Sequence, residues 1–231
     1  MEPEIEVLFE DDDVIVVSKP AGVYVHASPG HENGALADEL ARTRPQMRSV
    51  GSRERPGVVH RLDAETSGVM VFAKNDRAYR SLREAFESHA KVRKTYLAVL
   101  HGAPKERSGT LDNFIGRKPW DPKRMAVVGP GGDGRRAVSH WAVLAKRGGL
   151  ALVEFVIETG RMHQIRVHAA HLGHPVVGDR LYGDPERDAR VRPRPARQLL
   201  HAVELSFPHP ASGRTVTFAA PPPPDIVYSV K

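Results

Sequence analysis

The sequence predicts an α+β fold in which a mixed, largely antiparallel central sheet is flanked by helices and loops. Strand-like segments rich in β-branched and aromatic residues outnumber helical segments along the 231 residues. Short turns separate several successive strands, which favours antiparallel pairing. Strands and helices do not alternate regularly, as they would in a parallel βαβ fold.

The first expected strands lie at 5–9 and 14–18 and are joined by the acidic turn 10–13. Residues 34–45 predict a short amphipathic helix that ends before its proline. A third strand is expected at 68–73, where an apolar run follows a polar segment.

Asn75 is the expected N-cap of a helix that continues to about His89. Apolar side chains spaced four apart would form the buried stripe of this helix: Ala78, Leu82 and Phe86. The next strand is expected at 94–102. A hairpin follows, with strands at 139–146 and 150–159 joined by a glycine pair.

A further helix is expected within 160–172, because Ile165, Ala169 and Leu172 share one helical face. Gly173 can close this helix, and a proline two residues later prevents its return. The last strands are expected at 199–207 and 214–220.

Composition excludes several classes of protein. The apolar fraction of 40% indicates a globular chain, and no apolar segment approaches the roughly 20 residues that cross a bilayer. The N-terminus is acidic, unlike a signal peptide, so we expect a cytoplasmic protein. The absence of cysteine excludes disulfides, thiolate zinc sites and a cysteine nucleophile. The net charge of +6 favours a polyanionic partner such as nucleic acid, although solubility alone would also account for it.

The first candidate site is the segment HRLDAET at 60–66, which directly precedes an expected buried strand. Loops held by a rigid strand are where catalytic groups concentrate, and Asp63 is the candidate carboxylate. The alternative is a structural ion pair in which Arg61 and Asp63 stabilise a turn.

The second candidate site is the segment GRMHQIRVH at 160–168. Basic residues at the start of a helix oppose its dipole, so they indicate an anionic partner or a buried carboxylate. Arg166 is the expected partner of Asp63. The alternative is an exposed basic helix face.

Histidines at 163, 168, 171 and 174 raise the possibility of a metal site. We expect none, because no H-E-x-x-H pattern or carboxylate third ligand accompanies them. Tyr96 lies on an expected strand and either packs in the core or stacks on a base. Two basic stretches, 116–125 with Trp120 and 187–197 with five arginines, are candidate RNA contacts or ordinary exposed connections.

Five ordered blocks together resemble the RluA family of pseudouridine synthases. They are VLFEDDDVIVVSKPAGVYVHAS, HRLDAETSGVMVFAKN, KTYLAVLHG, ETGRMHQIRVHAAHLGHPVVGDRLYG and LLHAVELSFPHP, and they extend from about residue 5 to about residue 220. Met162 is a departure, because the family usually has Thr there.

The resemblance implies an RNA pseudouridine synthase, an isomerase that converts specific uridines in structured rRNA or tRNA to pseudouridine. It implies the catalytic fold of these enzymes, with Asp63 as the catalytic carboxylate. It also implies that Tyr96 packs on the uracil, that Arg166 pairs with Asp63, and that Arg61 helps to fill the space of the extruded nucleotide.

Further expectations follow from the resemblance. The reaction needs no metal and no organic cofactor. We expect residues 1–231 to form one catalytic domain without an N-terminal S4 domain, acting as a monomer with RNA as its partner and with no membrane or obligate protein partner. The alternatives are an RNA-binding protein on the same fold that has lost catalysis and a histidine-metal phosphodiesterase.

Overall fold

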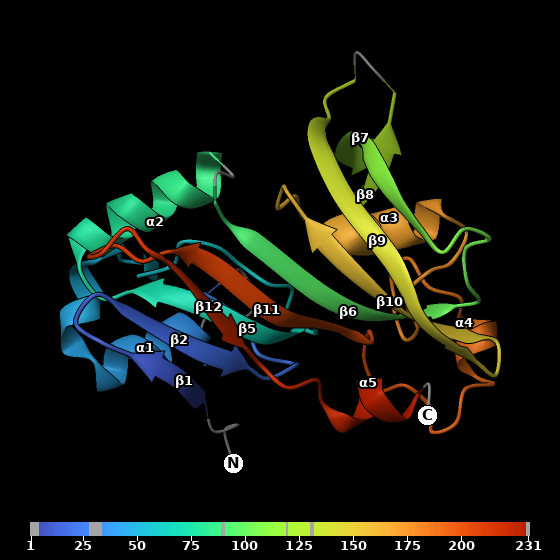
Figure 1. Ribbon diagram of the computed structural model, residues 1–231, viewed down its shortest axis with the longest axis horizontal. Coiled ribbons are helices and arrows are strands. Elements are labelled where there is room, and N and C mark those ends of the chain that lie inside the picture. The colour runs from blue at the N-terminus through green and yellow to red at the C-terminus, as the bar shows by residue number, and fades with distance from the viewer. Residues whose placement is uncertain (1–4, 28–33, 89–90, 119, 130–131, 230–231) are drawn as a thin grey trace. The chain divides into compact units, whose positions relative to one another are not determined.

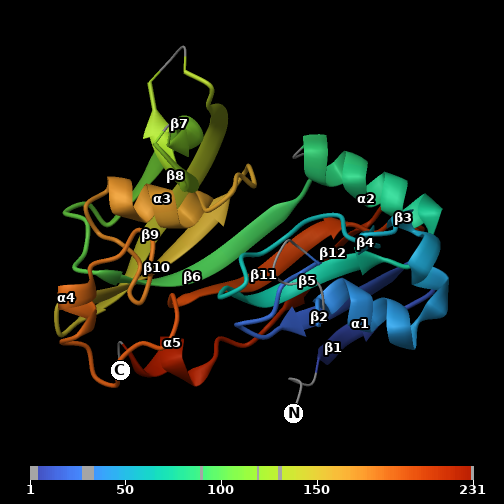
Figure 2. The same cartoon turned by 180° about the vertical axis from the view of Figure 1, so that it is seen from behind.

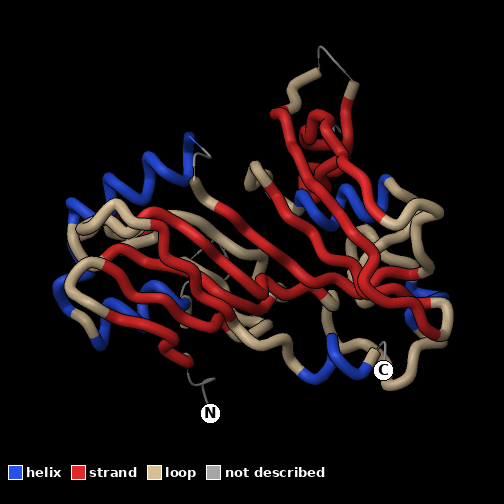
Figure 3. The backbone as a smooth tube through the Cα atoms, in the orientation of Figure 1, coloured by secondary structure: helices blue, strands red, loops and turns tan. Residues whose placement is uncertain are grey.

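The computed structural model describes residues 5–27, 34–88, 91–118, 120–129 and 132–229. The chain forms two compact units (Figure 1). Unit 1 comprises 1–93 and 202–221, and unit 2 comprises 94–201 and 222–231. The predicted α+β class with a largely antiparallel sheet is confirmed, and strands dominate the regular structure (Figure 3). The expectation of a single catalytic domain stays a prediction.

Unit 1 is built on strands that the sequence predicted. The strands β1 (Glu6–Glu10) and β2 (Val14–Lys19) pair antiparallel and are joined by the acidic turn. The other edge of β2 pairs antiparallel with β5 (Ser67–Ala73), in which every residue is buried. Because β5 lies inside the sheet and has both faces covered, its sequence after Ser67 is continuously apolar.

The strands β11 (Leu200–Pro208) and β12 (Thr215–Ala219) form an antiparallel pair that completes this part of the sheet. Gly68 on β5 has a φ of 124°, and a Cβ atom there would lie 2.2 Å from the carbonyl oxygen of Ala202 on β11. Only glycine therefore allows β11 to approach β5 this closely.

The helices of unit 1 are α1 (Leu36–Thr43) and α2 (Asp76–Ser88), with a short 3₁₀ helix at Pro45–Ser49. Figure 2 shows α1 in front of β1 and β2. Asn75 caps α2 as predicted, because its Oδ1 accepts a hydrogen bond of 2.9 Å from the Ala78 amide. The predicted stripe of α2 is buried, and the predicted helix end at His89 lies outside the described residues. A two-stranded ribbon of β3 (Gly51–Ser52) and β4 (Arg55–Pro56) was not predicted.

The strands of unit 2 lie in the order β6 (Arg93–His101), β10 (Leu150–Ile157), β9 (Arg135–Arg147), β7 (Ser108–Lys118) and β8 (Asp121–Val128). Neighbours in this order pair antiparallel. The predicted β9–β10 hairpin is confirmed, and both glycines of its turn have positive φ.

The stretch 116–125, interpreted as an RNA contact or an exposed hairpin connection, lies in the β7–β8 hairpin. Residues 116–118 pair with residues 121–126 across the hairpin, so the stretch is the end of two paired strands. Much of β7 is exposed or half-buried, and its polar composition concealed the strand because packing of an exposed hairpin needs few apolar residues.

The helices of unit 2 are α3 (Gln164–His171), α4 (Pro185–Asp188) and α5 (Pro224–Tyr228). Ile165 and Ala169 are buried on α3, Leu172 is half-buried, and Gly173 ends the helix with a φ of 78°. Within the described residues, no helix is both long enough and apolar enough to cross a membrane.

The segment between α3 and β11 is held against β6 by backbone hydrogen bonds. The Val177 amide donates to the Val99 carbonyl at 2.9 Å, and the Leu199 amide donates to the Val177 carbonyl at 2.8 Å. The same residues form an apolar cluster with Ile226 of α5. This cluster fixes α4 and the chain around it at the end of β6.

Candidate functional site

Asp63 lies in the loop that enters β5. Its side chain is half-buried, and Arg61 in the same loop is exposed. The Thr66 amide donates to the Asp63 carbonyl at 3.1 Å, so the chain makes a tight turn directly after the carboxylate. The position agrees with the expectation that a rigid buried strand presents this loop.

Lys19, at the end of β2, holds this loop in place. The side chain is fully buried, and its ammonium donates to the carbonyl oxygens of Pro20 at 2.8 Å, Val23 at 2.7 Å and Ala64 at 2.8 Å. Hydrogen bonds from a charged donor are stronger than neutral ones. Ala64 is adjacent to Asp63, so Lys19 fixes the backbone of the candidate carboxylate. The sequence signal that we missed is a lysine that directly follows an apolar strand.

Two histidines pack beneath the same region of unit 1. His60 stacks on Phe86 at 4.5 Å, and its Nε2 accepts from the Val71 amide at 3.1 Å. His26 is buried, and burial, followed by the nearby Arg55 and Arg61, lowers its pKa to about 4. The hydrogen bond that His60 accepts requires an unprotonated Nε2, and burial favours the neutral ring of His26.

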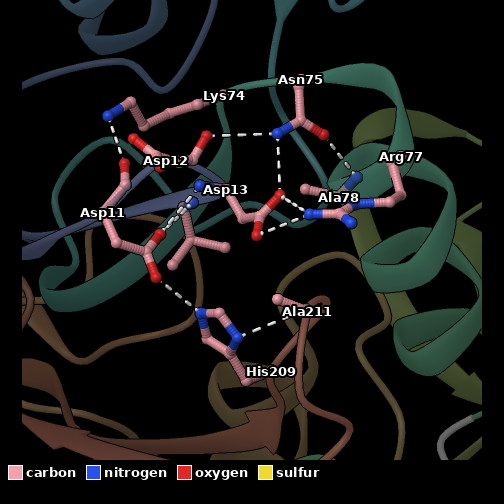
Figure 4. Close-up of polar contacts among 10 residues, drawn as sticks. Asp11, Asp12, Asp13, Lys74, Asn75, Arg77, Ala78, His209 and Ala211 are labelled. Atoms are coloured by element: carbon pink, nitrogen blue, oxygen red, sulfur yellow. Dashed lines mark hydrogen bonds and ion pairs between the residues drawn. The ribbon is translucent and has the colours of Figure 1, made fainter.

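The acidic turn between β1 and β2 is a structural cluster at the other end of β5 (Figure 4). Asp13 accepts hydrogen bonds from Asn75 at 2.8 Å and from Arg77 at 2.7 Å and 2.9 Å, and these partners lower its pKa. Asp11 is 2.9 Å from Nε2 of His209. The cluster therefore ties the turn to α2 and to the loop after β11.

Tyr96 lies on β6 opposite Phe155 of β10, and its side chain is buried. Lys94, two residues earlier, projects from the same face of β6 because side chains of a strand alternate. Its Nζ lies 3.4 Å and 3.3 Å from the carbonyl oxygens of Glu158 and Thr159, and burial, followed by Arg161, lowers its pKa to about 8. No carboxylate pairs with Lys94 in the part of the chain that the structure describes.

Arg166 on α3 forms a buried ion pair with Asp179. Nε donates to Oδ2 at 2.7 Å and Nη2 donates to Oδ1 at 2.8 Å, and the two side chains are 7% and 0% exposed. The guanidinium also lies 5.1 Å from the ring centre of Tyr182. Sequence reasoning missed Asp179, although G-D-R after the helix was part of the block that carried the resemblance.

The turn before α3 is fixed by a buried polar network around Gln164. Its Oε1 accepts from the Thr159 hydroxyl at 2.7 Å and from the Arg161 amide at 3.0 Å. Its Nε2 donates to the Val138 carbonyl at 2.9 Å and to the Ser139 hydroxyl at 3.0 Å. Gln164 thus connects β9, the end of β10 and α3, and a fully satisfied buried network of this kind orients the helix precisely.

The histidines of the second candidate segment have separate partners. Nδ1 of His163 is 2.9 Å from the Tyr182 hydroxyl, Nδ1 of His168 is 2.8 Å from the Ser139 hydroxyl, and Nδ1 of His174 is 3.0 Å from the His101 carbonyl. Among the described residues, no three His, Cys, Asp or Glu side chains are grouped so that they could hold a metal ion.

The basic stretch 187–197 divides into two kinds of arginine. Arg197 is buried and forms a bidentate pair with Asp225, at 2.8 Å and 3.0 Å, so it is structural and its interpretation as a surface contact is wrong. The other four are at the surface, with Arg187 half-buried and Arg190, Arg192 and Arg194 exposed. In the stretch 116–125, Trp120 is 79% exposed and Nζ of Lys118 lies 5.8 Å from its ring centre.

The predicted site residues are thus distributed over both units. Asp63 and Arg61 belong to unit 1, whereas Tyr96 and Arg166 belong to unit 2. The structure brings Arg166 to Asp179, and the predicted pairing of Arg166 with Asp63 stays a prediction.

Comparison with known proteins defines the class of this chain. The family model described as RNA pseudouridylate synthase matches residues 13–171, a range that contains Asp63, Tyr96 and Arg166. The chain belongs to this family, as the resemblance indicated.

Relatives come from several bacteria. An uncharacterized RNA pseudouridine synthase from Bacillus subtilis is 41% identical over 228 residues, which cover 99% of this chain and 72% of the relative. A ribosomal large subunit pseudouridine synthase D from Neisseria meningitidis serogroup A is 42% identical over 231 residues, covering 97% of this chain and 60% of the relative.

A similar RNA pseudouridine synthase from Synechocystis is 42% identical over 95% of this chain and 66% of the relative, so the chain spans only part of the length of such proteins. Among solved structures, human RNA pseudouridylate synthase domain containing 1 superposes with a TM-score of 0.79 and 29% identity. That match covers 100% of this chain and 91% of the human chain.

Proposed function

We propose that this protein isomerises specific uridines in RNA to pseudouridine, with Asp63 as the catalytic carboxylate. The observation that carries the proposal is the family match over residues 13–171, which includes the Asp63 loop and its buried anchor Lys19. A half-buried carboxylate on a loop held by charge-assisted hydrogen bonds is pre-organised for reaction with a bound nucleotide.

In the proposed reaction, the uridine leaves its stack in the RNA before it reacts, at a cost of a few kcal/mol that phosphate contacts offset. Asp63 then acts either as a base that removes the C2′ proton, on a route through a glycal, or as a nucleophile at C1′. On both routes the N1–C1′ bond breaks, the uracil turns and a C5–C1′ bond forms. The hydrogen at C5 leaves to water as a proton, so atoms and electrons balance without an added reactant.

Other residues have proposed roles in substrate binding. Tyr96 packs on the uracil, Arg166 pairs with the Asp63 carboxylate, and Arg61 helps to fill the space that the extruded nucleotide leaves. The pair with Asp179 orients the guanidinium of Arg166 through Nε and Nη2, so the proposed contact with Asp63 is made through Nη1.

The substrate that we propose is structured rRNA or tRNA, with rRNA favoured because the Neisseria relatives are named ribosomal large subunit pseudouridine synthase D. We further propose that the protein acts in the cytoplasm as a monomer, without a cofactor or an obligate protein partner. Pseudouridine mapping in cellular RNA with and without the protein would identify the modified position.

Release of tritium from RNA labelled at uridine C5 tests the reaction directly. We expect release by the wild type and none by Asp63→Asn, with RNA binding largely retained. Glu65→Gln is the matched control, because Glu65 is an exposed carboxylate of the same loop, and it should release tritium as the wild type does. Equal release by Asp63→Asn and the wild type would contradict the role of Asp63.

A histidine-metal phosphodiesterase is the competing function. Bound zinc or manganese in stoichiometric amount, together with RNA cleavage that a chelator abolishes, would favour it over the synthase.

A further inference from the structure

Unit 2 contains a cavity whose wall is strongly cationic. The cavity has a volume of about 540 Å³ and lies where β6 ends, between the β9–β10 turn and the chain around α4. Figure 1 shows α4 close to this turn. Arginines from separate segments line it: Arg147 at the end of β9, Arg187 in α4, and Arg190 and Arg192 after α4.

Within the described ranges of the chain, these arginines have no carboxylate partners. None of the four forms an ion pair in the described part of the chain, and no carboxylate is among the residues that line the cavity. Elsewhere the arginines of this protein commonly pair with acids, as Arg44 does with Glu10 and Arg136 with Asp112. Four uncompensated guanidinium groups around one cavity repel each other, so an anion that enters it is attracted by all of them.

Asp188, an acid at the end of α4, helps to build the wall. Oδ1 of Asp188 lies 2.7 Å from Nε2 of His101 and accepts from the Gly178 amide at 2.9 Å. Arg192 is also positioned, because its Nη1 donates to the carbonyl oxygens of Ala189 at 2.6 Å and Val191 at 2.9 Å. These neutral partners orient the guanidinium without cancelling its charge. The cationic wall is therefore held in shape by the fold.

The chemistry of the lining indicates phosphate groups. Guanidinium groups bind phosphate oxygens with two parallel hydrogen bonds, which makes arginine the preferred residue for this contact. Among the described residues that line the cavity there is no Phe, Tyr or Trp, and the ring of His101 is buried against Asp188, so the lining offers little surface on which a base could stack. The lining thus suits a nucleic-acid backbone better than a free nucleotide.

The position within unit 2 separates this cavity from the proposed uridine site. His101 lines it, and Tyr96 lies five residues earlier on the same strand. At roughly 3.3 Å per residue, these positions are about 16 Å apart along β6. A ligand in the cavity is therefore distinct from a uracil on Tyr96.

We propose that this cavity binds backbone phosphates of the RNA substrate at a distance from the modified uridine. The inference rests on the proposed function in taking RNA as the partner. Contacts to phosphates carry no sequence information, so the cavity contributes affinity and orientation of the RNA and leaves the choice of uridine to other contacts.

The test measures RNA affinity at several salt concentrations for Arg147→Gln/Arg190→Gln. Among the described residues, neither arginine side chain forms a hydrogen bond or an ion pair, so the variant should fold normally. We expect weaker RNA binding by about tenfold at low salt and a salt dependence whose log–log slope is smaller by about 1 to 2, because about two phosphate contacts are lost. In turnover, KM should rise and kcat should stay unchanged.

Lys105→Gln/Arg107→Gln is the matched control. It removes the same charge from exposed positions of unit 2 that do not line the cavity. We expect it to lower RNA affinity much less than the cavity variant does. Equal losses in both variants, or wild-type affinity in the cavity variant, would overturn the proposal.

Two competitors distinguish other ligands. If the cavity variant loses pyrophosphate binding but keeps wild-type RNA affinity, the cavity is a site for free phosphate. That result would refute the RNA proposal. Polyglutamate that competes as well as RNA at equal charge would indicate an acidic protein partner, with the same consequence. The RNA measurement is repeated with Asp63→Asn, so that binding is tested separately from catalysis. If RNA binding depends on the cavity but the wild type releases no tritium, only the proposed reaction is contradicted.

Discussion

Arg166 and Asp179 form a bidentate ion pair that is almost completely excluded from solvent. Oδ1 of Asp179 also accepts from the amides of Leu181 and Tyr182, at 2.9 Å and 3.0 Å. The pair thus joins α3 to the turn that follows it. Arg166 and these amides hold the pKa of Asp179 below its ordinary value, against the effect of burial.

Removal of the acid from this pair should be costly. We expect Asp179→Ala to lower the free energy of unfolding by about 3–5 kcal/mol, because the buried Arg166 guanidinium loses the carboxylate that accepts two of its hydrogen bonds. Urea unfolding at pH 7 measures the change. Asp112→Ala is the control, since the Arg136–Asp112 pair has the same bidentate geometry on the surface and should contribute little. Similar losses in the two variants would show that burial does not determine the contribution of the Arg166 pair.

Lys19 should affect turnover through the Asp63 loop. In Lys19→Met the carbonyl oxygens of Pro20, Val23 and Ala64 lose their shared donor, so we expect a loss of stability of about 2–4 kcal/mol. We also expect kcat for tritium release to fall at least tenfold with KM little changed, because the carboxylate is displaced and the RNA contacts are not.

Lys74→Met is the control for the Lys19 prediction. Lys74 also donates to a backbone carbonyl of unit 1, that of Asp11, and pairs with Glu10 at the opposite end of β5. It should lose stability with kcat close to that of the wild type. If kcat falls in proportion to the loss of stability in both variants, Lys19 affects turnover only through the stability of the fold.

His168 should make the protein sensitive to acid. It is fully buried, its Nε2 has no hydrogen-bond partner among the described residues, and burial, followed by His171, lowers its pKa to about 4. Between about pH 6.5 and 4 the unfolded state therefore binds more protons at this position than the folded state does. The contribution of neutral His168 to the free energy of unfolding is fully present above pH 6.5 and is lost as the pH falls towards 4. We expect this group to account for about 2–3 kcal/mol of the loss between pH 7 and 4.5.

The variant His168→Asn tests the acid sensitivity, because its side chain can keep the contact with Ser139 and does not titrate. Urea unfolding at both pH values should show a smaller acid loss than in the wild type. His171→Asn changes an exposed histidine of the same helix and should keep most of the wild-type pH dependence, because burial is the larger cause of the lowered His168 pKa. An unchanged pH dependence in His168→Asn would contradict the prediction.

Lys94 should destabilise the fold at neutral pH. Its pKa of about 8 means that the folded state binds fewer protons than the unfolded state between about pH 8 and 10.5. Below pH 8 the buried ammonium stays charged at a cost of about 3 kcal/mol. Lys94→Met should therefore raise the free energy of unfolding at pH 7 by about 1–2 kcal/mol, because the loss of its long hydrogen bonds offsets part of the gain.

The stability gain of Lys94→Met should shrink as the pH rises from 8 to 10.5, since the wild-type lysine then folds in its neutral form. Chemical unfolding across this range measures the difference between the two proteins. Lys105→Met, at an exposed position, should show no such trend. A lower stability of Lys94→Met at pH 7 would refute the prediction.

The order of secondary structure could be predicted from the sequence because it depends on local patterns. Alternating β-branched runs, the Asn75 cap and Gly173 each act within a few residues, and the corresponding strands and helices are confirmed. The β7–β8 hairpin was missed because its strands are largely exposed, so burial left little apolar pattern in them.

The family could also be recognised from the sequence, because its blocks are short and keep their residues and order. Partners far apart in the chain depended on the tertiary structure. Lys19 reaches Ala64 over 45 positions, and the cationic cavity assembles Arg147 with arginines about 40 residues later. Such contacts are decided by which strands pair and which side chains are buried together. Desolvation then sets the protonation of Lys94 and His168, and no local pattern in the sequence encodes it.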